Sequence, residues 1–157
     1  MKKIQWTELL IFIIGTELVG ALSGLLSGNF SSFYSELVKP PLSPPGILFP
    51  IVWAILYAIM GISAYMIYTS DAGDMKKRNA LSLYAAQLFF NFLWSIVFFR
   101  FEQPAAALGV LLLLAILIVL MILAFRKIRP LAGYLNIPYL LWVLFAMYLN
   151  IGFVLLN

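Results

Sequence analysis

The sequence consists of five apolar stretches separated by short polar segments, and each stretch is long enough to cross a membrane. They cover about residues 4–26, 48–68, 80–101, 105–125 and 131–156. The hydrocarbon core of a bilayer is about 30 Å thick and is crossed by about 20 apolar residues in a helix. Only 10% of the 157 residues are charged, against about 25% in soluble domains. We therefore predict an all-α protein, a single domain over residues 1–157 with five transmembrane helices, the last kinked at Pro138.

Two residue types are absent, and their absence excludes several functions. Without cysteine or histidine there is no disulfide framework, no zinc site of the Cys/His type, no histidine ligand for haem and no catalytic triad that needs either residue. We therefore expect no metal site and no obligatory cofactor. The net charge of +4 does not indicate a nucleic-acid partner, because the basic residues lie between the apolar stretches.

The basic residues predict how the chain crosses the membrane. If the five stretches cross in turn, eight Lys and Arg side chains lie on one side and two on the other, and cytoplasmic loops carry the excess. We predict a cytoplasmic N-terminus, an outer C-terminus and an outer loop at residues 27–46, long enough to cover a binding site. The short basic loops favour a bacterial inner membrane. The eight are Lys2, Lys3, Lys76, Lys77, Arg78, Arg126, Lys127 and Arg129, and the two are Lys39 and Arg100.

A polar stripe runs along the third stretch. Gln87, Asn91 and Ser95 recur every four residues, so they share one face of a helix with Phe90 and Trp94. An unpaired amide in lipid costs several kcal/mol, so we predict that this face contacts protein or a cavity. The fourth stretch, residues 105–125, has no polar side chain and is predicted to face lipid.

Aromatic residues on three stretches fall at similar depths. At about 1.5 Å per residue, Trp53 and Tyr57 of the second stretch and Trp142 of the fifth lie close to the depth of the polar stripe. We predict that these three helices surround one volume beneath the outer loop, suited to a large, flat, apolar ligand. The alternatives are that Trp53 belongs to an interfacial aromatic belt, and that Trp142 and Asn91 only pack helices together.

The first stretch carries an acidic residue and a series of glycines. Glu17 lies near the middle of the membrane, where a carboxyl group indicates a functional site unless it is structural and hydrogen-bonded. Gly20, Gly24 and Gly28 are spaced for close helix packing. This packing is either within the bundle or between two copies of the chain.

Four motifs carry a family resemblance. They are KPPLSPPG at residues 39–46 followed by FPIVW at 49–53, QLFFNFLWS at 87–95, PYLLW at 138–142 and AMYLN at 146–150. In this order they resemble the TspO/MBR family, which includes tryptophan-rich sensory proteins and the mitochondrial translocator protein, or peripheral benzodiazepine receptor. The resemblance covers nearly the whole chain.

The resemblance implies a commonly dimeric membrane protein that binds protoporphyrin IX and related tetrapyrroles. Members are also associated with light- and oxygen-dependent porphyrin breakdown, in which tryptophans matching Trp53 and Trp142 are implicated. The family's sterol motif is absent, because no basic residue follows Tyr148 within five positions. The positions that match the family's ligand site are Trp53, Tyr57, Phe90, Asn91, Trp94, Tyr139, Trp142 and Ala146.

The residues and the resemblance together predict a membrane receptor or sensor for tetrapyrroles and other flat apolar ligands. The first alternative is a porphyrin-degrading enzyme with Trp53 and Trp142 as catalytic residues. The second is a small transporter of porphyrins or lipophilic ligands, for which Glu17 is the only titratable group embedded in the membrane. We expect small apolar ligands, the lipid bilayer and a second copy of the chain as partners.

Overall fold

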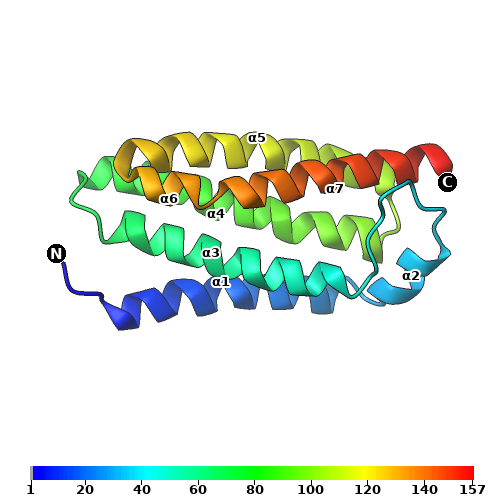
Figure 1. Ribbon diagram of the computed structural model, residues 1–157, viewed down its shortest axis with the longest axis horizontal. Coiled ribbons are helices and arrows are strands. Elements are labelled where there is room, and N and C mark those ends of the chain that lie inside the picture. Colours follow the sequence, from blue (N-terminus) through cyan, green and yellow to red (C-terminus); the bar gives the residue numbers. More distant parts are fainter. Residues whose placement is uncertain (1) are drawn as a thin grey trace.

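The protein is a bundle of five long helices (Figure 1). The computed structural model describes residues 2–157, and no strand occurs in that range. All five long helices have the length and apolar character needed to span a membrane, which confirms the predicted all-α fold. Their bounds are Trp6–Leu26 (α1), Leu48–Tyr68 (α3), Asp74–Ser95 (α4), Pro104–Ile128 (α5) and Ile137–Leu156 (α7), with short helices at Phe30–Glu36 (α2) and Pro130–Tyr134 (α6).

The third span is longer than predicted at its start. Helix α4 begins at Asp74, within the polar segment that precedes the third apolar stretch at about residue 80. A carboxylate in the first turn interacts favourably with the helix dipole, and polar residues there allow the helix to continue beyond the apolar layer. At the other end, α4 runs into a π-helical turn, Ile96–Arg100 (η1), which completes the span.

The last span is kinked, as predicted, but the break lies just before the proline. Helix α6 ends at Tyr134 and α7 begins at Ile137, so Pro138 occupies the first turn of α7. A proline is tolerated there because its missing N–H would have no partner within the helix. The Nδ2 atom of Asn136 donates to Ser63 Oγ of α3 at 2.8 Å. A neighbouring helix therefore supports the break.

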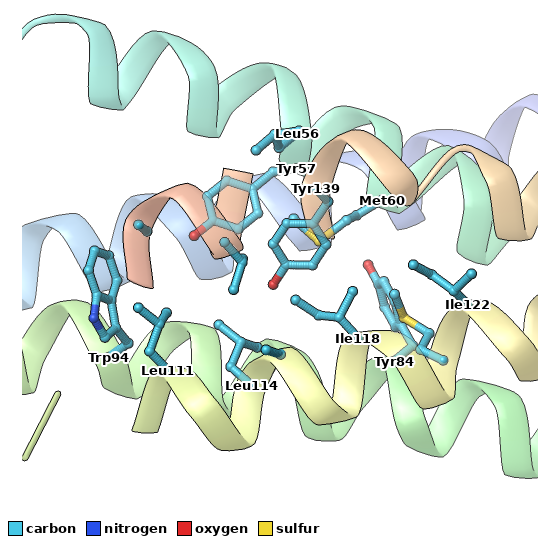
Figure 2. Packing of buried hydrophobic residues seen from close by; sticks show 14 of the residues in the cluster. Leu56, Tyr57, Met60, Tyr84, Trp94, Leu111, Leu114, Ile118, Ile122 and Tyr139 are labelled. Atoms are coloured by element: carbon cyan, nitrogen blue, oxygen red, sulfur yellow. The ribbon is translucent and has the colours of Figure 1, made fainter. Parts of the chain in front are cut away.

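Helix α5 corrects the prediction that the fourth stretch faces only lipid. Leu111, Leu114 and Ile118 are fully buried, and Figure 2 shows these side chains pointing into the core. The opposite face, which includes Leu112 and Leu113, is half exposed. The sequence could not separate the two faces, because lipid and a membrane protein's interior are equally apolar.

The ends of the helices alternate as predicted, with successive spans running in opposite directions through the bundle. Figure 1 shows the N-terminus, the α3–α4 connection and the α5–α6 connection at one end of the bundle, here called the N-terminal end. There Lys2 forms an ion pair with Asp71, and its hydrogen bond and charge lower the pKa of that carboxyl. The C-terminus and α2 lie at the opposite end, here called the α2 end. Which end faces the cytoplasm stays a prediction.

The segment predicted as an outer loop contains α2 and is packed against the bundle. The chain turns out of α1 at Gly28, whose φ of +76° favours glycine. Tyr34 Oη of α2 donates to the carbonyl of Pro44, and Tyr148 Oη of α7 donates to that of Pro41, both at 2.7 Å. Pro40 packs against Gly152 of α7, where a Cβ atom would overlap the proline ring. The proline-rich segment is therefore fixed across the α2 end of the bundle.

Candidate ligand-binding cavity

A cavity of about 400 Å³ lies between α1, α3 and α4 near the α2 end. Small-molecule sites typically measure about 300–1,000 Å³ and combine apolar walls with a few polar groups. Here α1 supplies small side chains, α3 and α4 supply aromatic rings, and α2 and η1 close one end. The lining residues are Glu17, Gly20, Ala21, Ser23, Gly24, Ser27, Phe30, Phe49, Pro50, Trp53, Ala54, Tyr57, Asn91, Trp94, Ser95 and Phe99.

An aromatic cluster forms the wall opposite α1. Trp53 and Tyr57 are four residues apart on α3, so they share one face, and their rings stack with centroids 5.5 Å apart. The Trp53 ring also lies 6.3 Å from Trp94 and 6.1 Å from Tyr139. These distances are typical of interacting aromatic pairs. The wall therefore presents broad, flat apolar surfaces to the cavity.

A chain of buried hydrogen bonds fixes this wall from behind. Tyr57 Oη donates to Asn91 Oδ1 at 2.6 Å, and Asn91 Nδ2 donates to Tyr139 Oη at 2.7 Å. Tyr139 Oη in turn donates to Gln87 Oε1 at 2.7 Å. Figure 2 shows the rings of Tyr57 and Tyr139 beside each other in the core. The polar stripe predicted on α4 thus faces protein, where each bond is protected from water.

Hydroxyl groups close the cavity between α1 and α4. Ser95 Oγ lies 2.5 Å from Ser23 Oγ and 2.8 Å from Ser27 Oγ. Ser23 Oγ also bonds the carbonyl of Phe92 at 3.0 Å, and further along the same interface Thr16 bonds the hydroxyl of Tyr84. These contacts connect the two helices across several turns.

The cavity opens sideways between α1 and α3. Ala21 and Gly24 on α1 and Pro50 and Ala54 on α3 line the cavity and are themselves exposed at the bundle surface. That surface belongs to two membrane-spanning helices, so the opening faces the bilayer. A ligand dissolved in the membrane can therefore reach the cavity without passing through water.

Of the three glycines on the first stretch that were predicted to permit close packing, Gly20 does so within the bundle, and Gly24 and Gly28 do not. A Cβ atom at Gly20 would overlap the ring of Tyr57, whereas one at Gly24 would meet nothing within 4 Å. On α3, Gly61 lies against the backbone of α1 at Ile13. Gly20 is thus needed to admit the Tyr57 ring, and Gly24 leaves open space beside the cavity.

The structure brings together half of the site residues that the sequence predicted. Trp53, Tyr57, Asn91 and Trp94 line the cavity. Tyr139 lies behind the wall, where it is fully buried. The prediction that the second, third and fifth spans enclose the volume is wrong in one helix, because α1 rather than α7 forms the third wall. Helix α7 packs against α5, and helix α6 packs between α3 and α5. This arrangement keeps α7 away from the opening.

Three predicted site residues lie away from the cavity. Phe90 is half buried beside Phe89. Trp142 packs against Phe49, with ring centroids 5.9 Å apart, and its buried Nε1 has no hydrogen-bond partner within residues 2–157. Ala146 lines a separate space of about 20 Å³ next to Trp94, which is near the size of one water molecule.

Several lining residues were not predicted as part of the site. Phe30 comes from α2, Phe49 from the first turn of α3 and Phe99 from η1. Glu17 and Gly20 were noted on the first stretch but were not assigned to the site. A usable signal was present, because small and polar residues at positions 16, 20, 23, 24 and 27 mark one helical face that admits close neighbours.

The TspO/MBR family model matches residues 11–156. The chain belongs to this family. It is 41% identical over 110 residues to the tryptophan-rich protein TspO of Chlorobaculum tepidum, a match that covers 70% of each chain. It is 36% identical over 109 residues to the tryptophan-rich sensory protein of Cereibacter sphaeroides, covering 69% of this chain and 66% of the relative. The human translocator protein is 36% identical over 100 residues, covering 63% and 59%.

Family membership and the five apolar helices establish a multi-pass integral membrane protein. Membership also supports a sensor or receptor role in the membrane. The chain spans about two thirds of the length of the relatives that it matches.

Proposed function

We propose that this protein is a membrane receptor for tetrapyrroles such as protoporphyrin IX and for other large, flat, apolar ligands. The observation that carries the proposal is the cavity itself, with stacked and tilted rings on one wall and small residues opposite them. Flat conjugated ligands gain from contact with aromatic faces beyond the area that they bury. The sideways opening suits molecules that reside in the bilayer.

The fixed geometry of the aromatic wall also supports binding of a rigid ligand. Trp53 and Tyr57 stack on each other, and the Tyr57 hydroxyl is held by Asn91. A wall that is already ordered loses little side-chain freedom when the ligand binds, which favours affinity. The proline-rich segment, fixed by Tyr34 and Tyr148, covers the same end of the bundle.

The test is a spectral titration with protoporphyrin IX, performed anaerobically in darkness on protein in phosphatidylcholine nanodiscs. We expect a saturable shift of the porphyrin absorbance band and quenching of tryptophan fluorescence. Trp53→Ala should weaken binding up to about tenfold, since an aromatic contact contributes about 0.5–1.5 kcal/mol beyond its buried area. Leu113→Ala is the control, because Leu113 is 51% exposed on α5. Equal affinities for the two variants would reject this cavity as the site.

A second candidate function is light- and oxygen-dependent porphyrin breakdown. One observation favours it: Trp53 lines the cavity within 6.3 Å of Trp94 and stacks on Tyr57, so three oxidisable rings adjoin the space that a ligand would fill. In this function dioxygen takes an electron from the light-excited ligand, and the Trp53 indole then gives an electron to the oxidised ligand or forms an adduct with it. Trp142, the other candidate, does not line this cavity.

A further inference from the structure

Among residues 2–157, Glu17 is the only charged residue that lines the cavity. It lies on α1, one turn from Gly20 and on the same face, in the wall that faces Tyr57. Within residues 2–157 its carboxyl forms no hydrogen bond and no ion pair, the single salt bridge there being Lys2 with Asp71. A carboxyl group among apolar neighbours is unfavourable unless a donor or a cation pairs with it.

The cavity wall does not provide that donor. The hydroxyl of Tyr57 donates to Asn91, and the indole of Trp94 donates to Asn150 at 3.2 Å. The three serines of the α1–α4 interface bond to one another and to backbone carbonyls. Among the lining residues, only Trp53 has an indole N–H with no partner within residues 2–157, and it lies one helical turn nearer the α2 end than Tyr57. Glu17 is therefore free to pair with a donor on a ligand in the cavity.

We propose that Glu17 selects ligands that place a nitrogen-bound hydrogen against it, and that it keeps ligand carboxylates at the α2 end of the cavity. This inference rests on the proposed function, since it takes the cavity as the ligand site. A nitrogen donor satisfies the carboxyl oxygen, and a positively charged nitrogen also balances its charge. A ligand carboxylate at the same place would meet like charge.

Two kinds of ligand carry this chemistry. The first is a flat apolar amine, whose ammonium group is both a donor and a cation. The second is an open-chain tetrapyrrole, whose pyrrole N–H groups lie along an accessible edge. In a closed macrocycle such as protoporphyrin IX, the N–H groups point to the centre of the ring, so its edge offers Glu17 no donor. Glu17 therefore favours an amine or an open-chain tetrapyrrole over the closed ring.

The experiment compares matched probes on variants in phosphatidylcholine nanodiscs. The probes are 1-pyrenemethylamine and 1-pyreneacetic acid, which share a flat ring system and differ in charge, with binding followed by energy transfer from tryptophan. Glu17→Gln removes the charge, and Glu17→Met also removes the acceptor. Glu8→Gln is the control, because Glu8 is on the same helix but outside the cavity lining. Affinity for the amine should fall about tenfold or more in both Glu17 variants, while affinity for the acid should stay level or rise.

A second arm distinguishes the two ligand sources. Biliverdin dimethyl ester and protoporphyrin IX dimethyl ester both lack free carboxylates, and only the first presents pyrrole N–H groups at its edge. If Glu17→Met weakens binding of the biliverdin ester but not of the protoporphyrin ester, the natural donor includes pyrrole nitrogen. If only pyrenemethylamine is affected, the donor is an amine. Unchanged binding of the protoporphyrin ester also shows that the variant retains its cavity.

The outcomes separate this inference from the proposed function. If the probes and protoporphyrin IX bind wild-type protein, but neither Glu17 variant changes any affinity more than about twofold, the inference is overturned and the receptor function stands. If wild-type protein binds none of these molecules saturably, both are overturned. If Glu8→Gln changes the probe affinities as much as Glu17→Gln does, the effect comes from the charge of helix α1 in general, and the selective role of Glu17 is rejected.

Discussion

The ring of Tyr57 occupies the position that a side chain at Gly20 would fill. This contact between α3 and α1 places the Tyr57 hydroxyl within 2.6 Å of Asn91 on α4. One tyrosine thus connects the three helices that surround the cavity. Changes on α1 at this point should therefore affect the hydrogen-bond chain behind the aromatic wall.

Gly20→Ala should destabilise the protein and weaken ligand binding together. The added methyl group displaces the Tyr57 ring, and overpacking of this kind typically costs about 1–3 kcal/mol. Unfolding by dodecyl sulfate in mixed micelles measures the free energy of unfolding, and porphyrin titration measures affinity. Gly15→Ala is the matched control on the same helix, because a Cβ there meets nothing within 4 Å and Gly15 is outside the cavity lining. Similar losses in both variants would contradict the close contact.

Asn91→Ala should cost about 1–3 kcal/mol of unfolding free energy, because it leaves two buried hydroxyl groups, those of Tyr57 and Tyr139, without their shared partner. Unfolding by dodecyl sulfate in mixed micelles measures this loss, as it does for Gly20→Ala. Ser82→Ala is the control on the same helix, since Ser82 is exposed and bonds only the backbone of Arg78. A loss no larger than that of the control would show that the hydrogen-bond chain contributes little.

The amide spacing on α4 was enough to predict part of the site from sequence. Unpaired amides are costly in lipid, so residues 87 and 91 had to face protein, and they do. The contribution of α3 to the site could be predicted as well, because Trp53 and Tyr57 lie at depths close to that of the polar stripe. The fold was predicted for the same physical reason, since a bilayer admits few structures for five apolar segments.

The third wall could not be predicted in the same way. Helix α1 offers Gly20, Ala21 and Gly24, small residues that predict close packing but not which helix is the partner. Trp142 was misplaced because depth along a helix does not determine which way the side chain faces around the axis. Phe30 closes the α2 end of the cavity because it lies on α2, a helix of 7 residues. The sequence of that segment predicts a loop, so the position of Phe30 could not be predicted.

Tyr34→Phe should loosen the proline-rich segment without changing the transmembrane core. The Tyr34 hydroxyl donates to Pro44 at 2.7 Å, and losing such a bond costs about 0.5–1.5 kcal/mol. We expect faster association and release of porphyrin in stopped-flow measurements, with a smaller change in affinity. Tyr148→Phe removes a similar bond to Pro41 and should act in the same direction. Unchanged rates in both variants would show that the segment does not control access.

The contribution of Tyr34 should also depend on pH. Burial raises the pKa of Tyr34 above its ordinary value of 10.0. The folded state therefore favours the protonated hydroxyl, so the stabilisation is complete below pH 10 and is lost as the pH rises through the folded-state pKa. The difference in unfolding free energy between wild type and Tyr34→Phe should shrink in that range. A difference that is constant up to pH 12 would contradict this assignment.

Trp53→Phe and Trp142→Phe should differ in porphyrin breakdown. Phenylalanine keeps a stacking face but lacks the readily oxidised indole, so the affinity of Trp53→Phe should fall by no more than about 1.5 kcal/mol, while light-driven bleaching falls much further. Trp142 packs against Phe49 away from the cavity, so its variant should bleach porphyrin at nearly the wild-type rate. The measurement is loss of porphyrin absorbance under matched light and oxygen, at equal ligand occupancy.

If Trp53→Phe bleaches as fast as wild type, Trp53 is only a cavity wall. If Trp142→Phe alone is inactive, the reacting ligand lies on the α7 side of Phe49, and the site proposed between α1, α3 and α4 is wrong for this reaction.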